Sequence, residues 1–131
     1  MPKTFYEKEL ERLFSEISLP VKNYTLIRQS KAFMEQYYSQ KIELNDLAKA
    51  AFMSRFHYVR VFKQMYGVTP RSYLKDMRIS KAKELLKEGH SITDTCIEVG
   101  YESLATFSIT FKKSVGYSPR EFQRIYKSSP K

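Results

Sequence analysis

The stretch from Ser54 to Tyr66 carries basic side chains and no carboxylate. Arg55, Arg60 and Lys63 fall on one side of it if the stretch is helical. An arginine can hold O6 and N7 of a guanine with two hydrogen bonds, and a lysine can neutralise a phosphate. These residue types at this spacing predict contact with the anionic major groove of DNA. A solvated surface helix is the alternative, although such helices usually mix charges of both signs.

The other side of the same stretch is apolar. Tyr58, Val61, Phe62 and Met65 stand at i, i+3, i+4 and i+7, the spacing of the inward stripe of an amphipathic helix. They are therefore expected to form core rather than to stack on bases. His57 could be a buried residue with its hydrogen bonds satisfied, a donor to phosphate, or a metal ligand. The outward side presents Arg55, Phe56, Val59, Arg60 and Lys63.

The chain repeats itself at a shift of 49 residues. The residues Phe62-Lys63, Gly67, Thr69-Pro70-Arg71 and Tyr73 recur as Phe111-Lys112, Gly116, Ser118-Pro119-Arg120 and Phe122. Upstream the shift is 48, because Leu44, Ala48 and Ala51 are answered by Ile92, Cys96 and Val99, so the second copy has one extra residue in its turn. Each copy predicts a short helix, a tight connection and a longer helix.

Two helices joined in this way are typical of a helix-turn-helix, whose second helix can enter a major groove. An ordinary helical hairpin is the alternative. In the second copy Phe107, Thr110 and Phe111 are expected to point inward. The outward face is nearly uncharged and could touch thymine methyl groups and donate a hydroxyl, so weaker or more permissive base recognition is expected there. This face consists of Leu104, Ala105, Ser108, Ile109 and Lys112.

Glycine and capping residues mark the ends of the expected helices. Each glycine follows an apolar-periodic stretch, as a helix C-cap would, and Ser118-Pro119-Arg120-Glu121, Ser91-Ile92-Thr93-Asp94 and Thr69-Pro70 provide helix starts. No persuasive strand pattern occurs, which predicts an all-α fold. The expected helices cover 5–17, 24–39, 44–51, 54–66, 70–88, 92–99, 103–115 and 119–127.

These helices predict four parts along the chain. An N-terminal helix or linker covers 1–23, the first helix-turn-helix subdomain 24–69, a long linker helix 70–89, and the second helix-turn-helix subdomain 90–131. The linker helix is expected to set the two subdomains so that they meet successive major grooves, about 34 Å apart. One chain could then bind an asymmetric site as a monomer.

The composition limits the classes of protein to which the chain could belong. The chain has 131 residues, a net charge of +9 and a single cysteine, Cys96, which favours a polyanionic partner and excludes an intrachain disulfide. It has two histidines, His57 and His90, and neither a GxGxxG nor a GxxxxGK[ST] motif, so no enzyme, metal or cofactor is expected. Without an apolar run of membrane-spanning length or a signal-like start, a cytoplasmic protein is expected. A helical module whose basic face binds an acidic protein is the competing function.

The residues of the second copy resemble the DNA-binding domain of the AraC/XylS family of bacterial transcription regulators. The resemblance covers roughly residues 25 to 127, and it includes Arg78-Ile79 and Ala82 of the linker helix. Its most specific part consists of Ile92, Cys96, Val99-Gly100-Tyr101, Phe107-Ser108, Phe111-Lys112-Lys113, Gly116 and Ser118-Pro119.

The resemblance implies a homeodomain-like fold of seven helices and binding to promoter DNA, commonly to activate transcription through RNA polymerase. It implies base contacts by Arg55, Phe56, Val59, Arg60, Leu104, Ala105, Ser108 and Ile109. Contacts with the DNA backbone are expected from Ser54, His57, Lys63, Arg71, Ser103, Lys112, Lys113, Arg120 and Arg124. Ile109 stands where many relatives have arginine.

The amino-terminal segment 5–17 places Tyr6, Leu10, Leu13, Phe14 and Ile17 on one side of the helix expected there. About twenty extra residues are too few for a sensor domain. The chain is therefore expected to be either a short regulator without a sensor or the end of a longer one, in which case it could also dimerise.

Overall fold

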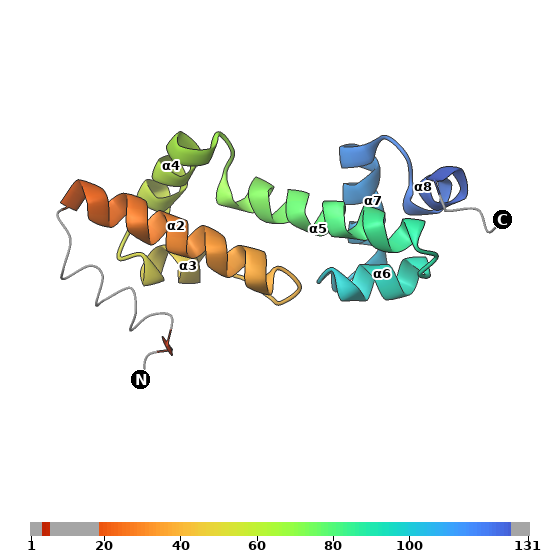
Figure 1. Cartoon of the computed structure of the whole chain (residues 1–131), viewed down its shortest axis with the longest axis horizontal. Helices are drawn as coiled ribbons and strands as arrows, with labels where there is room; N and C mark the ends of the chain where they lie inside the picture. The colour runs from red at the N-terminus through yellow and green to blue at the C-terminus, as the bar shows by residue number, and fades with distance from the viewer. Residues whose placement is uncertain (1–3, 6–18, 127–131) are drawn as a thin grey trace. The chain divides into compact units, whose positions relative to one another are not determined.

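The computed structural model describes residues 4–5 and 19–126. Within these ranges the chain is built from α-helices and contains no strand. The all-α prediction is confirmed (Figure 1). The seven helices are α2 Leu19–Tyr37, α3 Leu44–Ala50, α4 Arg55–Tyr66, α5 Pro70–Lys87, α6 Ile92–Glu98, α7 Leu104–Val115 and α8 Pro119–Tyr126.

Helix α2 begins at Leu19, earlier than the expected start at residue 24. Pro20 lies in its first turn, where a proline is tolerated because the N–H groups there have no partner within the helix. The helix expected over 5–17 falls almost entirely on residues outside the described part of the chain.

The expected helix starts of the second half are confirmed. The hydroxyl of Ser91 accepts a hydrogen bond from the N–H of Asp94 at 3.0 Å. Ser118 and Glu121 form a reciprocal capping box, in which each backbone N–H donates to the other side chain, at 3.0 and 3.1 Å. These bonds fix where α6 and α8 begin.

The described residues divide into two compact units. Unit 1 comprises the residues up to Tyr37 and Ile42–Leu74, and unit 2 comprises Tyr38–Lys41 and the residues from Lys75 onward. The chain therefore passes from one unit to the other three times. Helix α5 contributes its first turn to unit 1 and the remainder to unit 2.

The core of unit 1 is formed by α2, α3 and α4. Tyr58 and Phe62 of α4 are fully buried and Val61 is nearly so, as the apolar stripe predicts, whereas Met65 is half-buried. The Tyr58 hydroxyl donates to Ser30 Oγ at 2.8 Å, and Ser30 in turn donates to a backbone carbonyl of α2. Burial raises the pKa of Tyr58 to about 12. Further buried apolar residues among those described in this unit are Leu26, Ile27, Met34, Leu47, Ala48, Ala51 and Pro70.

The core of unit 2 is aromatic. The rings of Phe111 and Phe122 lie edge to face with centroids 5.4 Å apart, and Phe107 lies 5.8 Å from Phe111. Thr110, expected inward, is half-buried. Cys96 is buried, as expected for a packing residue. The cluster is completed by Ile79, Ala82, Leu85, Leu86 and Val99.

The short segment Tyr38–Lys41 belongs to unit 2 because Arg78 binds it. The guanidinium donates to the carbonyl of Tyr38 at 2.7 Å and to that of Gln40 at 2.9 Å, and it lies over the ring of Tyr101. Burial lowers the pKa of Arg78. A side chain at Gly100 would come within 2.8 Å of the Ser39 carbonyl oxygen, so only glycine permits this approach.

Candidate nucleic-acid interface

The two copies of the sequence repeat fold into the same tight turn. In unit 1 the N–H of Met53 donates to the carbonyl of Ala48 at 3.0 Å. In unit 2, 48 residues later, the N–H of Tyr101 donates to the carbonyl of Cys96 at the same distance. The extra residue of the second copy, Glu102, follows this bond. The repeat is therefore a repeat of backbone structure, with α3 and α4 in one copy and α6 and α7 in the other.

Both turns contain one residue with left-handed backbone. In unit 2 it is Gly100, at φ 94°, and in unit 1 it is Phe52, at φ 58°. Left-handed backbone costs a residue with a Cβ about 1–2 kcal/mol. The sequence did not indicate strain at Phe52, because phenylalanine is not a turn residue. Its alignment with Gly100 is the signal that could have revealed it.

Capping residues define both ends of helix α4, the helix that carries the basic face. Ser54 is the N-cap and accepts a hydrogen bond from the N–H of His57 at 3.2 Å, and Gly67 is the C-cap at φ 78°. The hydroxyl oxygen of Ser54 is the acceptor of this capping bond, so the O–H group can still donate a hydrogen bond to a phosphate. The first turn holds no acidic residue, which keeps the positive end of the helix dipole uncompensated.

The predicted base-contacting residues of α4 lie at its surface. Arg55 and Arg60 are exposed, Phe56 is 88% exposed, and Val59 is half-buried. Lys63 is exposed one turn further along. Phe56 thus places an aromatic ring in contact with solvent between the exposed side chains of Arg55 and Arg60.

His57 is half-buried and paired with Arg60. Nη2 of Arg60 lies 3.1 Å from Nδ1 of His57. A guanidinium can only donate, so the imidazole accepts through Nδ1 and carries its proton on Nε2. That Nε2–H is a donor that could serve a phosphate. Among the described residues no group of three or more potential metal ligands gathers at any site.

Helix α7 is capped at both ends in the same way as α4, but its exposed side chains are different. Ser103 caps it by accepting from the N–H of Thr106 at 3.2 Å, and Gly116, at φ 95°, ends it. Leu104 is 46% exposed and Ile109 is 59% exposed. Ala105 is exposed and Ser108 is half-buried, while Lys112 and Lys113 are exposed in the last turn.

Helix α8 adds two basic side chains to unit 2. Arg120 and Arg124 are both exposed, and Phe122 between them anchors the helix on Phe111 of α7. Hydrogen bonds from the backbone N–H and side chain of Ser118 lower the pKa of Glu121. The charge of this carboxylate is thus held at the N-terminal end of α8, where the helix dipole favours it.

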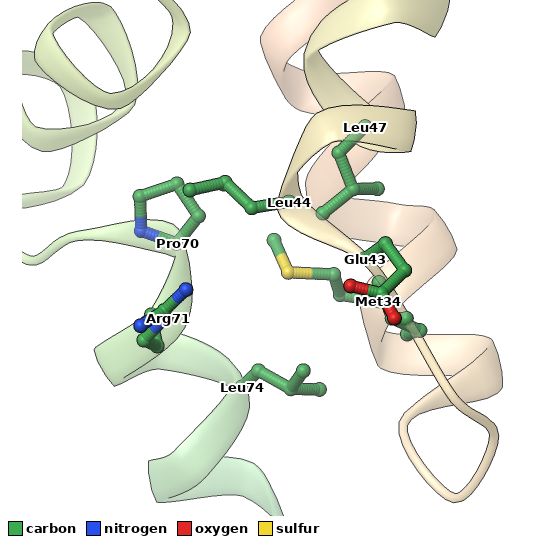
Figure 2. A pocket seen from close by; sticks show the side chains of 8 residues that line it. Met34, Glu43, Leu44, Leu47, Pro70, Arg71 and Leu74 are labelled. Carbon is green, nitrogen blue, oxygen red and sulfur yellow. The ribbon is translucent and has the colours of Figure 1, made fainter. Parts of the chain in front are cut away.

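Arg71 lies in the first turn of α5 and is exposed. It lines a small cavity of about 80 Å³ in unit 1, together with Glu43 and Leu44 at the start of α3. Figure 2 shows Met34, Leu44 and Leu74 around this cavity, each from a different helix. Arg71 is thus grouped with the cavity, and its contact with DNA stays a prediction.

None of the helices in the described part of the chain is both long and apolar enough to cross a membrane.

Comparison with known proteins identifies the family. Residues 47–125 match the family model HTH_18, a helix-turn-helix domain. The HTH-type transcriptional regulator YbfI of Bacillus subtilis is 36% identical over 69 residues, which are 53% of this chain and 25% of that protein. This chain thus spans a quarter of the length of this relative.

Solved structures of other proteins have the same fold. The C-terminal domain of AraT, a response regulator from Geobacillus stearothermophilus, has a TM-score of 0.74 and 29% identity, over 79% of this chain and 88% of that one. The DNA-binding domain of the global transcriptional factor AdpA, solved with a target DNA, has a TM-score of 0.72 at 24% identity, over 76% of this chain and 91% of that one. With a matching family model over more than half of its length and this shared fold, the chain belongs to the AraC family of helix-turn-helix DNA-binding transcription regulators.

Proposed function

We propose that this chain binds promoter DNA in a sequence-specific manner as a monomer, placing α4 and α7 in successive major grooves of one duplex. The observation that carries the proposal is the exposed face of α4, on which Arg55, Phe56, Arg60 and Lys63 lie without any carboxylate. Arginine side chains and a neighbouring exposed ring suit the floor of a major groove, where guanine and thymine present their edges. Unit 1 then dominates sequence selection.

The proposal gives the side chains two kinds of role. Base edges are contacted from α4 by Arg55, Phe56, Val59 and Arg60, and from α7 by Leu104, Ala105, Ser108 and Ile109. Phosphates are contacted by Ser54, His57, Lys63, Arg71, Ser103, Lys112, Lys113, Arg120 and Arg124. Phosphate contacts fix the position of the protein on the duplex, and base contacts select the sequence.

Selection from random duplexes tests this function. The chain is incubated with a library of random double-stranded DNA, and the bound fraction is sequenced after several rounds. An enriched motif, with an affinity that falls steeply with salt, supports the proposal, because log affinity falls by about 0.9 per neutralised phosphate for each unit of log salt concentration. A library that stays random, with binding confined to acidic proteins, contradicts it and favours the competing interaction module.

We further propose that the bound chain activates transcription in the cytoplasm through RNA polymerase and catalyses no reaction itself. The exposed parts of α3 and α6 carry none of these proposed DNA contacts and remain available for the polymerase. Transcription in vitro from a promoter carrying the selected motif tests this step. More transcript with the chain supports activation, whereas less transcript identifies a repressor. The same promoter with a scrambled motif is the control.

A further inference from the structure

We propose that unit 2 selects thymine, through contacts of Leu104 and Ile109 with the C5 methyl group of the base. This inference rests on the proposed DNA-binding function and names the chemistry that α7 recognises. At positions where α4 presents the hydrogen-bond donors of two arginines, α7 presents two apolar side chains.

The two helices provide a matched pair for this comparison. Both begin at a serine N-cap and end at a glycine with left-handed backbone. At the shift of 49 residues, Arg55 and Arg60 of α4 correspond to Leu104 and Ile109 of α7. The caps of the two helices are therefore the same, whereas the two guanidinium groups of α4 are replaced in α7 by branched apolar side chains.

The apolar side chains of this face do not belong to the core cluster of unit 2. Phe107 and Phe111 fill that core from the other side of α7 and are fully buried. Leu104 and Ile109 instead keep 46% and 59% of their surface in contact with solvent. Two large apolar side chains exposed on one helix indicate a surface that a partner covers.

The charges around the face indicate what this partner is. Helix α7 contains no carboxylate, and Lys112 and Lys113 stand in its last turn. Arg120 and Arg124 of α8 add positive charge to the same unit. These charges suit a partner that is anionic and that also offers an apolar group. A phosphate backbone alone supplies the first property and not the second.

Thymine supplies the apolar group. It is the one standard base with a methyl group in the major groove, and apolar side chains contact this methyl in known complexes. Guanine would require donors that Leu104 and Ile109 lack. The hydroxyl of Ser108, between them on the helix, can donate to O4 of thymine or N7 of adenine, and it can accept from the N6 amino group of adenine. The preference therefore arises mainly from removing the methyl and the two side chains from water.

The test removes the methyl group from the DNA. The duplex enriched by the whole chain is resynthesised with each thymine replaced, one at a time, by deoxyuridine, which lacks only the C5 methyl. Affinity is measured by fluorescence anisotropy. We expect about a fourfold loss at each thymine that α7 contacts, the value of one buried methyl group. A 5-methylcytosine in place of the contacted thymine, paired with guanine, should retain more affinity than unmodified cytosine.

A protein variant assigns the effect to α7. In L104A/I109A the loss caused by deoxyuridine should disappear at those positions, because the apolar partner is gone. I97A is the matched control, since Ile97 of α6 is also exposed but lies outside this face. R60A, which alters α4, should keep the full loss. Thermal unfolding by circular dichroism checks that each variant folds.

The outcomes separate the two proposals. Thymines whose methyl effect depends on Leu104 and Ile109 support the inference. An enriched motif in which no methyl effect depends on them overturns the inference and leaves the DNA-binding function standing. Failure to enrich any motif overturns the proposed function, and the inference with it.

Discussion

Arg60 donates a hydrogen bond through Nη2 to Nδ1 of His57, which lies one turn earlier on α4, over 3.1 Å. The bond uses one of the five N–H groups of the guanidinium and leaves the others free. It limits the rotamers of a long side chain before DNA is bound, and ordering such a side chain on binding costs about 0.5–1.5 kcal/mol. His57 is thereby a candidate positioning residue for the predicted base contact of Arg60.

Replacing Arg60 by alanine separates base contact from phosphate contact. R60A should lose about 1–3 kcal/mol of binding free energy on the enriched duplex and little on unrelated duplexes. K63A is the matched control, because a phosphate contact should weaken binding to all duplexes alike and lower the salt slope by about 1. Salt titrations of both variants on both duplexes measure this. Equal losses for R60A on the two duplexes would assign Arg60 to the backbone.

Two replacements of His57 test its positioning role. H57F removes the acceptor for Arg60, so the ratio of affinities for enriched and unrelated duplexes should fall by about twofold to twelvefold, the equivalent of the ordering cost. In H57N the amide oxygen can stand near the place of Nδ1, and the ratio should recover at least in part. Fluorescence anisotropy measures both ratios. Should H57F weaken binding to the two duplexes equally, the imidazole would act only as the proposed phosphate donor and not as a positioning residue.

Replacing Ile109 by arginine gives α7 the side chain that α4 has at the equivalent position. I109R should bind DNA more tightly, and a new selection should enrich guanine where the natural chain enriches thymine, because guanine offers two acceptors to a guanidinium. The matched control is I97R, which adds the same charge on α6. A gain in affinity that is equal in the two variants would show that charge alone acts. An unchanged motif and affinity for I109R would mean that α7 does not approach the bases.

Alanine at Gly100 should destabilise unit 2 more than alanine at Gly116. Both glycines have left-handed backbone, which costs alanine about 1–2 kcal/mol. Only at Gly100 would the added Cβ meet backbone, with the Ser39 carbonyl oxygen 2.8 Å away. That overlap should add about 1–3 kcal/mol. Urea unfolding of G100A and G116A, followed by circular dichroism, compares the two, and equal midpoints would refute the close contact.

Tyr58 should make the stability of unit 1 depend on alkaline pH. Its pKa is raised to about 12 by burial, while tyrosine in the unfolded chain ionises near pH 10. Above pH 10 the unfolded state therefore releases a proton that the folded state retains, and the free energy of unfolding falls until about pH 12, by about 2 kcal/mol.

The variant Y58F isolates this contribution. Ser30 still donates to the carbonyl of Ile27 in Y58F, so no buried donor is left without a partner. Denaturant unfolding between pH 9 and 12 should show a shallower decline for Y58F than for the natural chain. Parallel declines would mean that other groups cause the alkaline loss.

The helices could be predicted from the sequence because their signals are local. The capping box at Ser118 and Glu121 and the left-handed glycines depend only on neighbouring residues, and the shift of 49 residues carried the prediction from one copy to the other. The candidate faces of α4 and α7 followed from helical spacing in the same way. The hydrogen bond between His57 and Arg60, three residues apart on α4, is a local signal that was overlooked.

What could not be predicted depends on contacts distant in the sequence. Arg78 reaches back about forty residues to bind the carbonyls of Tyr38 and Gln40, and no periodicity marks those partners. The strained backbone of Phe52 is likewise imposed by the turn between α3 and α4, against the preference of the residue. Tertiary structure overrides local propensity at both places.

The binding of Tyr38–Lys41 by Arg78 makes unit 2 discontinuous in the gene. A fragment that starts at Lys75 would leave its guanidinium facing solvent and the surface beside Gly100 uncovered. Recombination between two regulators with a single crossover in the part of α5 before Arg78 would likewise take Arg78 from one parent and its carbonyl partners from the other. Chimeras that exchange DNA-recognition units should therefore transfer Tyr38–Lys41 together with the rest of unit 2. Arg78 and its carbonyl partners then come from the same parent.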